Sequence, residues 1–285
     1  MFKIGYIFEK VLYRLLLTSG WKRDVVQTNL SYAHPTSSKI IYIKEYRQII
    51  SNLSHHVSNI LFDFGSFKKL PQDFNSYPFK QNGITYKLAN DSEPVLNKMS
   101  KGGIFLTAHY GNYEAIGPWL CRLGIPLKAS YIPLKPAALN RIVENRIRSV
   151  DKRNYSVNAK NPREFLRLLD DKNLFCLLMD QDSRIESAAT GTFLGKPVHV
   201  NPLPDFLLKH RPETPVFICW LQESRKSEKS KEERILHATE ITPVNNSVNE
   251  AFNRWLENRI AENPALWYGW THRRFYSCNP DIYQK

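Results

Sequence analysis

Short apolar runs alternate with amphipathic segments along most of this 285-residue chain. The apolar runs lie at about 104–108, 125–132, 173–179 and 215–222, and 235–241 follows as the hairpin partner of the last. Runs of this length suit buried strands, and a strand, a helix and a strand in succession favour parallel pairing. We therefore expect an α/β fold, with a central, mostly parallel mixed sheet flanked by helices.

Helical spacing of apolar residues predicts the helices between these strands. They are expected at about 91–99, 112–123, 136–150, 162–171, 203–210 and 248–262. The segment 65–90 is irregular apart from a short strand at 83–87, and 224–234 is a charged, solvated hairpin loop.

Residues 1–64 are predicted to form an N-terminal helical extension, with breaks near Trp21 and Pro35. The remainder, 65–285, forms the α/β unit. Because no long linker or low-complexity tract separates the two parts, we expect one continuous domain with the extension packed on it.

The first helix carries apolar residues at helical spacing, and its basic residues lie largely off that face. Its uninterrupted apolar runs are far shorter than the roughly 20 residues that span a bilayer. Charges also break the apolar stretch that a signal peptide needs. Two placements remain open, an in-plane anchor on a membrane surface and a helix packed on the core. The apolar positions are Phe2, Ile7, Phe8, Val11, Leu12, Leu15 and Leu16.

The formal net charge of +13 favours a polyanionic partner, which can be a nucleic acid, an anionic membrane surface, an acidic carrier protein or a phosphorylated lipid. No recognisable nucleic-acid-binding module accompanies this charge, so nucleic acid is not expected as a partner. The four cysteines are scattered and form no C-x-x-C pair. We expect neither a zinc site nor any other metal or organic cofactor.

His109 and Glu114 carry the most distinctive candidate chemistry, at the boundary between the apolar run 104–108 and the next helix. Within one helix, residues five positions apart would lie about 140° apart around the axis. Across a strand-to-helix turn at Gly111 and Asn112 they can meet. A carboxylate on one imidazole nitrogen would leave the other free as a general base. Asn112 is the expected N-cap of the helix.

The hexapeptide 109–114 resembles the H-x4-D/E motif of the bacterial lipid A biosynthesis acyltransferases, a branch of the lysophospholipid acyltransferase superfamily. Two further family signatures follow in order: Asp180-Gln181-Asp182 with the F-x-G-x-P segment 193–197, and the W-x-H-R-R-F segment 270–275. The resemblance covers about 23–275 and implies a glycerolipid acyltransferase-like fold.

The resemblance also implies the roles of individual residues. His109 would be the general base and Glu114 its orienting carboxylate, with backbone N–H groups around Gly111 binding the oxyanion. The family carries Tyr-Arg-Pro where this chain has Tyr131-Ile132-Pro133. Either Lys135, Arg146 or Arg148 replaces the missing arginine, or phosphate recognition differs from that of the family. The expected substrate-binding residues are Gly111, Asn112, Arg146, Arg148, Asp180, Gln181, Asp182, Arg273 and Arg274.

The implied function is transfer of a fatty acyl chain from acyl carrier protein to a hydroxyl of a lipid A precursor, a phosphorylated glycolipid. The implied location is peripheral, at the cytoplasmic face of the bacterial inner membrane. Two alternatives stay open. One is acylation of another acceptor, such as a phosphatidylinositol mannoside or a lysophospholipid. The other is a non-catalytic, basic protein that binds membrane surfaces.

Overall fold

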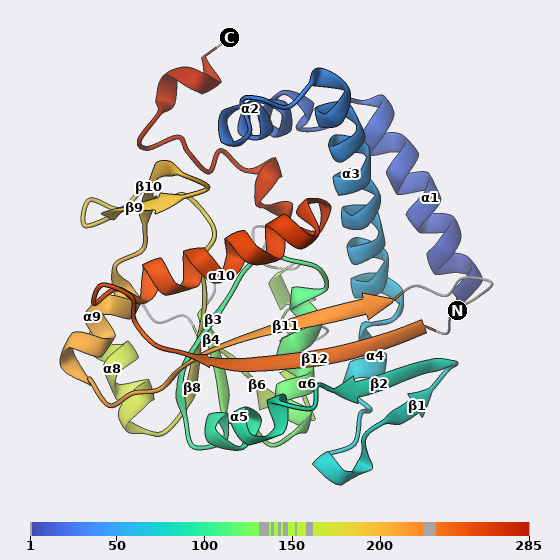
Figure 1. Ribbon diagram of the computed structural model, residues 1–285. Helices are drawn as coiled ribbons and strands as arrows, with labels where there is room; N and C mark the ends of the chain where they lie inside the picture. The colour runs from blue at the N-terminus through green and yellow to red at the C-terminus, as the bar shows by residue number, and fades with distance from the viewer. Residues whose placement is uncertain are drawn as a thin grey trace.

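An eight-stranded sheet lies at the centre of the structure, a computed structural model that describes residues 2–130, 137, 140–141, 144, 148–151, 153–157, 162–224 and 232–284 (Figure 1). Its strand order is β1-β2-β12-β11-β3-β8-β4-β7. The strands are β1 (Phe79–Gln81), β2 (Ile84–Leu88), β3 (Gly103–Thr107), β4 (Leu127–Ser130), β7 (Ser156–Val157), β8 (Leu174–Leu178), β11 (Val216–Ser224) and β12 (Glu232–Ile241).

The sheet is mixed but mostly parallel, as predicted. The neighbours β2–β12, β11–β3, β3–β8, β8–β4 and β4–β7 run parallel. The other two neighbouring pairs of these described strands, β1–β2 and β11–β12, are antiparallel. Two small hairpins lie outside this sheet: β5 (Ser149–Val150) with β6 (Arg153–Asn154), and β9 (Ala189–Phe193) with β10 (Lys196–Val200).

Helices cover both faces of the sheet. The described α-helices are α1 (Phe2–Thr18), α2 (Arg23–Ala33), α3 (Lys39–Phe62), α4 (Phe64–Phe67), α5 (Ser92–Met99), α6 (Ile116–Arg122), α8 (Pro162–Asp170), α9 (Leu203–His210) and α10 (Val248–Glu262). Short 3₁₀ turns are η1 (Phe74–Ser76), η2 (Tyr113–Ala115), η3 (Pro264–Leu266), η4 (Tyr268–Thr271) and η5 (Pro280–Tyr283).

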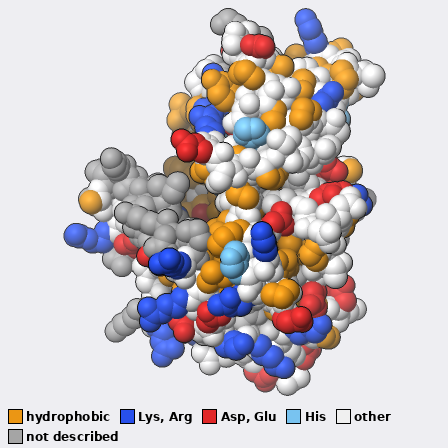
Figure 2. Space-filling view, turned by 90° about the vertical axis from the view of Figure 1, so that its left-hand side faces the viewer, with side chains coloured by type: hydrophobic (Ala, Val, Ile, Leu, Met, Phe, Trp, Pro, Cys, Tyr) orange, Lys and Arg blue, Asp and Glu red, His pale blue; other side chains and the backbone are white. Residues whose placement is uncertain are grey.

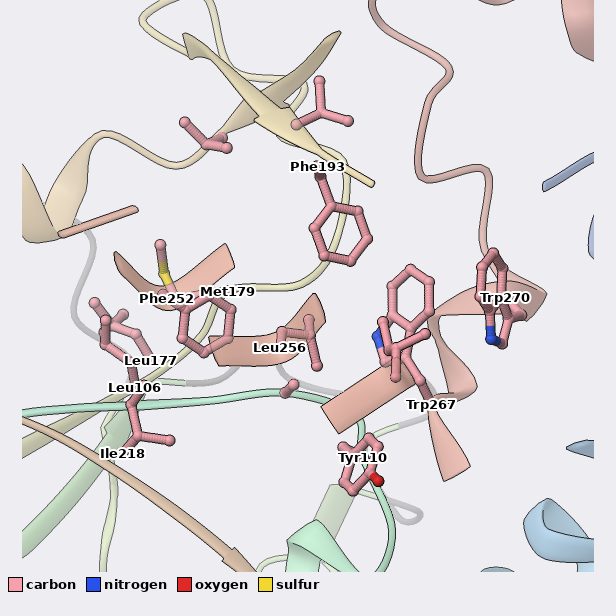
Figure 3. Close-up of a cluster of buried hydrophobic side chains, with 14 of the residues drawn as sticks. Leu106, Tyr110, Leu177, Met179, Phe193, Ile218, Phe252, Leu256, Trp267 and Trp270 are labelled. Atoms are coloured by element: carbon pink, nitrogen blue, oxygen red, sulfur yellow. The ribbon is translucent and has the colours of Figure 1, made fainter. Parts of the chain in front are cut away.

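The pleat of the central strands divides the core into two clusters. In β3, Ile104 and Leu106 face one cluster and Phe105 faces the other, because successive side chains of a strand point to opposite faces. Figure 3 shows the first cluster, where Leu106 lies with Leu177 of β8 and Ile218 of β11 beneath α10. Both faces of the sheet are thus buried, as a parallel sheet requires.

The first helix has one face packed against the protein and one face exposed. Helix α1 packs along α3 (Figure 1), with the Phe8 ring 5.4 Å from that of Phe62. Its inner residues are partly buried, while a second set of large apolar side chains is exposed: Ile4, Tyr6, Ile7, Val11 and Leu15. Within the described residues, no helix combines the length and apolar character needed to cross a membrane.

Several predicted boundaries need correction. The helix expected over 112–123 is the 3₁₀ turn η2 followed by α6 from Ile116. Most of the helix expected over 136–150 lies outside the described residues, and its end, 149–150, is strand β5. Both ends of the loop expected at 224–234 are strand residues, because β11 extends to Ser224 and β12 begins at Glu232. Residues 225–231 lie outside the described residues.

The hairpin of β9 and β10 was not predicted. Its two-residue turn consists of Leu194 at φ 51° and Gly195 at φ 70°, the pair of positive φ values that a tight hairpin turn requires. The sequence offers leucine at the first position, where asparagine or aspartate would have given the usual signal.

Figure 2 shows basic and acidic side chains intermixed over the lower part of one face. On that face the excess positive charge does not form a single basic stripe of the kind expected for nucleic acid.

Candidate active site

Two neighbouring strands bring His109 and Asp180 together. Strand β3 pairs in parallel with β8, and Thr107 is the partner of Leu178 at the end of both strands. His109 and Asp180 each follow two residues later. Because the carboxyl ends of parallel strands share one edge, the two side chains meet at the edge where α/β folds place their sites.

The His109 Nδ1 atom lies 2.8 Å from Asp180 Oδ1. The other carboxylate oxygen, Oδ2, accepts hydrogen bonds from the His109 backbone N–H at 3.1 Å and from Trp267 Nε1 at 2.8 Å. Asp180 is only 1% exposed. Both oxygens of this buried carboxylate therefore have N–H partners, which fix it between His109 and Trp267.

His109 and Asp180 each stabilise the charged form of the other. Burial opposes the charge of Asp180, but His109 and the hydrogen bonds from His109 and Trp267 lower the pKa of this carboxyl group below its usual value. Burial likewise opposes a charged His109, but Asp180 raises the pKa of the imidazole. Since Asp180 accepts the proton on Nδ1, the neutral ring keeps Nε2 as an acceptor.

Gln181 lies on the Nε2 side of the His109 ring. Its Nε2 atom is 3.5 Å from His109 Nε2, and the side chain is exposed. An amide donor at this position can hydrogen-bond the oxygen atom of a substrate that approaches His109.

Glu114 does not form the expected hydrogen bond with His109, because Asp180 occupies Nδ1. Glu114 instead lies within η2, where burial raises the pKa of its carboxyl group and the charges of Arg148 and His109 oppose that shift. The turn holds Glu114 near enough for its charge to act on the imidazole. Its catalytic role stays a prediction.

The turn between His109 and Glu114 also differs from the prediction. Gly111 adopts φ +58°, and its N–H donates to the Leu266 carbonyl at 2.9 Å, so this N–H is not available to an oxyanion. Asn112 makes no capping hydrogen bond with its side chain. Its Nδ2 donates instead to Glu223 Oε1 on β11 at 3.0 Å, which ties the motif to the sheet.

The predicted substrate-binding arginines differ in exposure and in their partners. Arg273 is exposed, whereas Arg274 is buried and donates from Nη1 to the His199 carbonyl at 2.8 Å. Burial lowers the pKa of Arg274 to about 10. Arg148 is partly buried and acts electrostatically on Glu114. Arg146, like the segment 131–136, lies outside the described residues.

Asp182 has a structural partner, and its predicted substrate-binding role stays a prediction. Its carboxylate accepts a 2.7 Å hydrogen bond from Ser277 Oγ and so joins the loop after β8 to the C-terminal segment.

Sequence reasoning gave no site role to Trp267, His272 or His56, which lie against His109 or against its partners. Trp267 is the donor to Asp180, and the His272 ring lies 5.9 Å from that of His109. The His56 ring of α3 is tilted against the Tyr113 ring, with 4.9 Å between centroids. The Tyr113 ring in turn contacts His109, also at 4.9 Å. Burial lowers the pKa of His56 to about 3, so this histidine is neutral. Of these three residues, the sequence singled out only Trp267 and His272, because both belong to the aromatic segment 265–275.

Comparison with known proteins identifies the family of the chain. A family model described as bacterial lipid A biosynthesis acyltransferase matches residues 10–277. The search among curated proteins gave no match. The family model covers nearly the whole chain, including the strand ends that carry His109 and Asp180. The chain therefore belongs to the bacterial lipid A biosynthesis acyltransferases.

Proposed function

We propose that this protein transfers a fatty acyl chain from the thioester of acyl carrier protein to a hydroxyl of a lipid A precursor. Membership of the family makes it an acyltransferase, and the donor and acceptor are the proposal. The observation that carries the proposal is the 2.8 Å contact between His109 Nδ1 and Asp180, which leaves Nε2 as a base.

In the proposed reaction, His109 Nε2 accepts the proton of the acceptor hydroxyl while its oxygen attacks the thioester carbonyl carbon. The tetrahedral oxyanion then collapses, the C–S bond breaks, and the imidazolium returns its proton to the leaving thiolate. The products are an ester and a free carrier thiol, so atoms and charges balance. Asp180 stabilises the imidazolium between the two steps.

A covalent acyl-enzyme is not needed for this route. The sequence has no G-x-S-x-G nucleophile motif. Burial raises the pKa of Cys121 to about 12 and the pKa values of Cys176 and Cys219 still further above that of a free thiol. A thiol that stays protonated is a poor nucleophile.

Glu114 has a proposed role through its charge. It lies near both Arg148 and His109, so its ionised form would favour the imidazolium that develops during the reaction. Gln181 is the proposed hydrogen-bond donor to the substrate oxygen, and Arg148 and Arg273 are proposed contacts of the acceptor.

The exposed apolar residues of α1 support a peripheral location at the cytoplasmic face of the inner membrane. Tyr13 of α1 lines a shallow groove with Ile40, Ile43, Lys44 and Arg47 at the start of α3. Exposed aliphatic side chains beside lysine and arginine suit the interface of an anionic bilayer. In this proposal the extension, 1–64, holds the enzyme where its lipid substrate resides.

The test is acyl transfer from labelled acyl carrier protein to a purified lipid A precursor. Wild-type protein should form the acylated product, and His109→Ala should lower the rate by at least about a hundredfold. The exposed variant Arg167→Gln on α8 is the matched control and should match wild type. If wild type fails to acylate this acceptor, the substrate assignment is wrong. If His109→Ala retains full activity, the mechanism is wrong.

A further inference from the structure

Two guanidinium groups lie over one tyrosine ring beside the candidate active site. Arg184 Cζ is 5.0 Å from the Tyr276 ring centroid, and Arg273 Cζ is 5.8 Å from it. Arg273 also lies 5.7 Å from the centroid of the Tyr283 ring. Contacts with aromatic faces hold arginine side chains in place while their N–H donors stay available.

The segments that carry these arginines both adjoin His109. Arg184 belongs to the loop that begins with Asp180 and Gln181, which contact the imidazole. Arg273 directly follows His272, whose ring lies 5.9 Å from that of His109. A hydrogen bond of 2.7 Å from Ser277 to Asp182 fastens the two segments together. Both arginines therefore belong to segments that contact His109, and both lie over the same tyrosine ring.

Both arginines are available to a ligand. The Arg184 side chain is 64% exposed, and its nearest carboxylate is that of Asp182, with 3.6 Å between Nε and Oδ2. In the described part of the chain Arg273 forms no ion pair with a carboxylate. Arg274, by contrast, is 1% exposed and donates to the His199 carbonyl, so it belongs to the interior.

The local charge balance is positive. Asp182 is the one carboxylate paired with these arginines in the described residues, and it is largely buried. A third cation, Lys196, lies 4.9 Å from the Tyr32 ring centroid, and that ring packs on Phe275. Two forked guanidinium groups with surplus positive charge suit the several oxygens of a phosphate better than a single carboxylate.

We propose that Arg184 and Arg273 form a phosphate-binding site beside the candidate active site. The source of the phosphate rests on the proposed function. It is either a phosphate of the glycolipid acceptor or the phosphodiester of the pantetheine arm on the carrier protein. None of the sequence motifs includes Arg184. In this proposal it takes the substrate-binding role that the W-x-H-R-R-F motif suggested for Arg274.

Steady-state kinetics of Arg184→Gln, Arg273→Gln and the double variant test this site. Each single change should raise one KM by about tenfold and leave kcat within about twofold, because charge-assisted hydrogen bonds position the ligand without entering the chemical step. Arg167→Gln, whose side chain is 84% exposed on α8, is the control and should behave as wild type.

The two possible sources of the phosphate predict different changes in KM. If the phosphate belongs to the acceptor, the acceptor KM rises, and wild type and variants become equal with a dephosphorylated acceptor. If it belongs to the carrier arm, the donor KM rises instead. Arg273→Lys should retain part of the affinity, since it keeps the charge and loses the fork. Unchanged KM values for both substrates would overturn the proposal.

Titration of wild-type protein with inorganic phosphate separates this site from the proposed function. The Nε–H nuclear magnetic resonance signals of Arg184 and Arg273 should shift, and that of Arg167 should not. If these signals shift but no acyl transfer occurs, the phosphate site stands and the proposed function fails. If the signals do not move, the phosphate site is wrong even where acyl transfer succeeds.

Discussion

The His109 imidazole and the Asp180 carboxylate meet at 2.8 Å although 71 positions separate them in the chain. The parallel register of β3 and β8 sets this distance, and Trp267 holds the carboxylate from the other side. Asp180 is thus placed to position the proposed general base, a role that the sequence had suggested for Glu114.

Replacing Asp180 with asparagine should lower kcat by at least about a hundredfold. An amide at this position can present its NH₂ group to Nδ1 and so stabilise the wrong tautomer of His109. The measurement is acyl transfer at saturating substrates. Asp171→Asn, an exposed carboxylate after α8, is the control. A kcat for Asp180→Asn equal to that of the control would show that the contact has no part in catalysis.

The pH profile should report the same interaction. A general base has to be neutral, so kcat/KM should rise as the pH increases through the pKa of His109. Asp180 and Glu114 both raise the pKa of His109. Removing either negative charge, in Asp180→Asn or Glu114→Gln, should therefore move the acidic limb to lower pH. An acidic limb that stays in place in both variants would mean that another group titrates there.

Gly269→Ala should damage both stability and activity. A Cβ atom at this position would overlap ring atoms of Trp267, which is fully buried. The Trp267 ring has to move, which should lower the free energy of unfolding by about 3 kcal/mol. The movement should also break the hydrogen bond from Trp267 Nε1 to Asp180. Gly65→Ala in α4 is the control, because a Cβ atom there would have no neighbouring atom within 4 Å. Denaturant unfolding and kcat together test this, and normal values of both would contradict it.

Arg234→Met should destabilise the junction between α3 and the sheet. This arginine is 2% exposed and pairs with Asp63, Glu223 and Glu232. Its loss leaves three partly buried carboxylates without a cation and should lower the free energy of unfolding by about 3 kcal/mol, the low end of the range for a broken buried pair, because water partly screens these charges. Arg254→Met is the comparison.

Arg254 forms an exposed i,i+4 pair with Glu250, so its loss should cost less than about 1 kcal/mol. Because Glu223 also binds Asn112, the Arg234 variant should lose activity even where it stays folded. Equal stability of the two methionine variants, measured by denaturant unfolding, would refute this reading of the cluster.

Membrane association should depend on the exposed face of α1. Charged residues at Ile7 and Leu15, in the double variant Ile7→Asp/Leu15→Asp, should reduce co-sedimentation with anionic phospholipid vesicles by about tenfold or more. Thr190→Asp, an exposed position on β9, should bind as wild type does. The double variant should keep its secondary structure, since both side chains are exposed. Undiminished vesicle binding would place the membrane contact elsewhere.

The sequence by itself determined the α/β architecture and the location of the candidate site. Apolar runs of strand length and helical periodicities are local properties, readable within a few residues of Leu106 or Phe252. The same holds for the position of His109 just after a buried strand. The three family signatures added the reaction class, which the family match supports.

Only the tertiary structure decided which carboxylate holds His109. Asp180 reaches Nδ1 because β8 is the sheet neighbour of β3, and the order of strands depends on the packing of the whole chain. Packing of the whole chain also decides three other contacts between distant segments. These are the hydrogen bond from Trp267 to Asp180, the hydrogen bond from the Gly111 N–H to Leu266, and the contact of Arg184 with Tyr276. Periodicity specifies each element, whereas contacts between distant elements follow from how both faces of the sheet are buried.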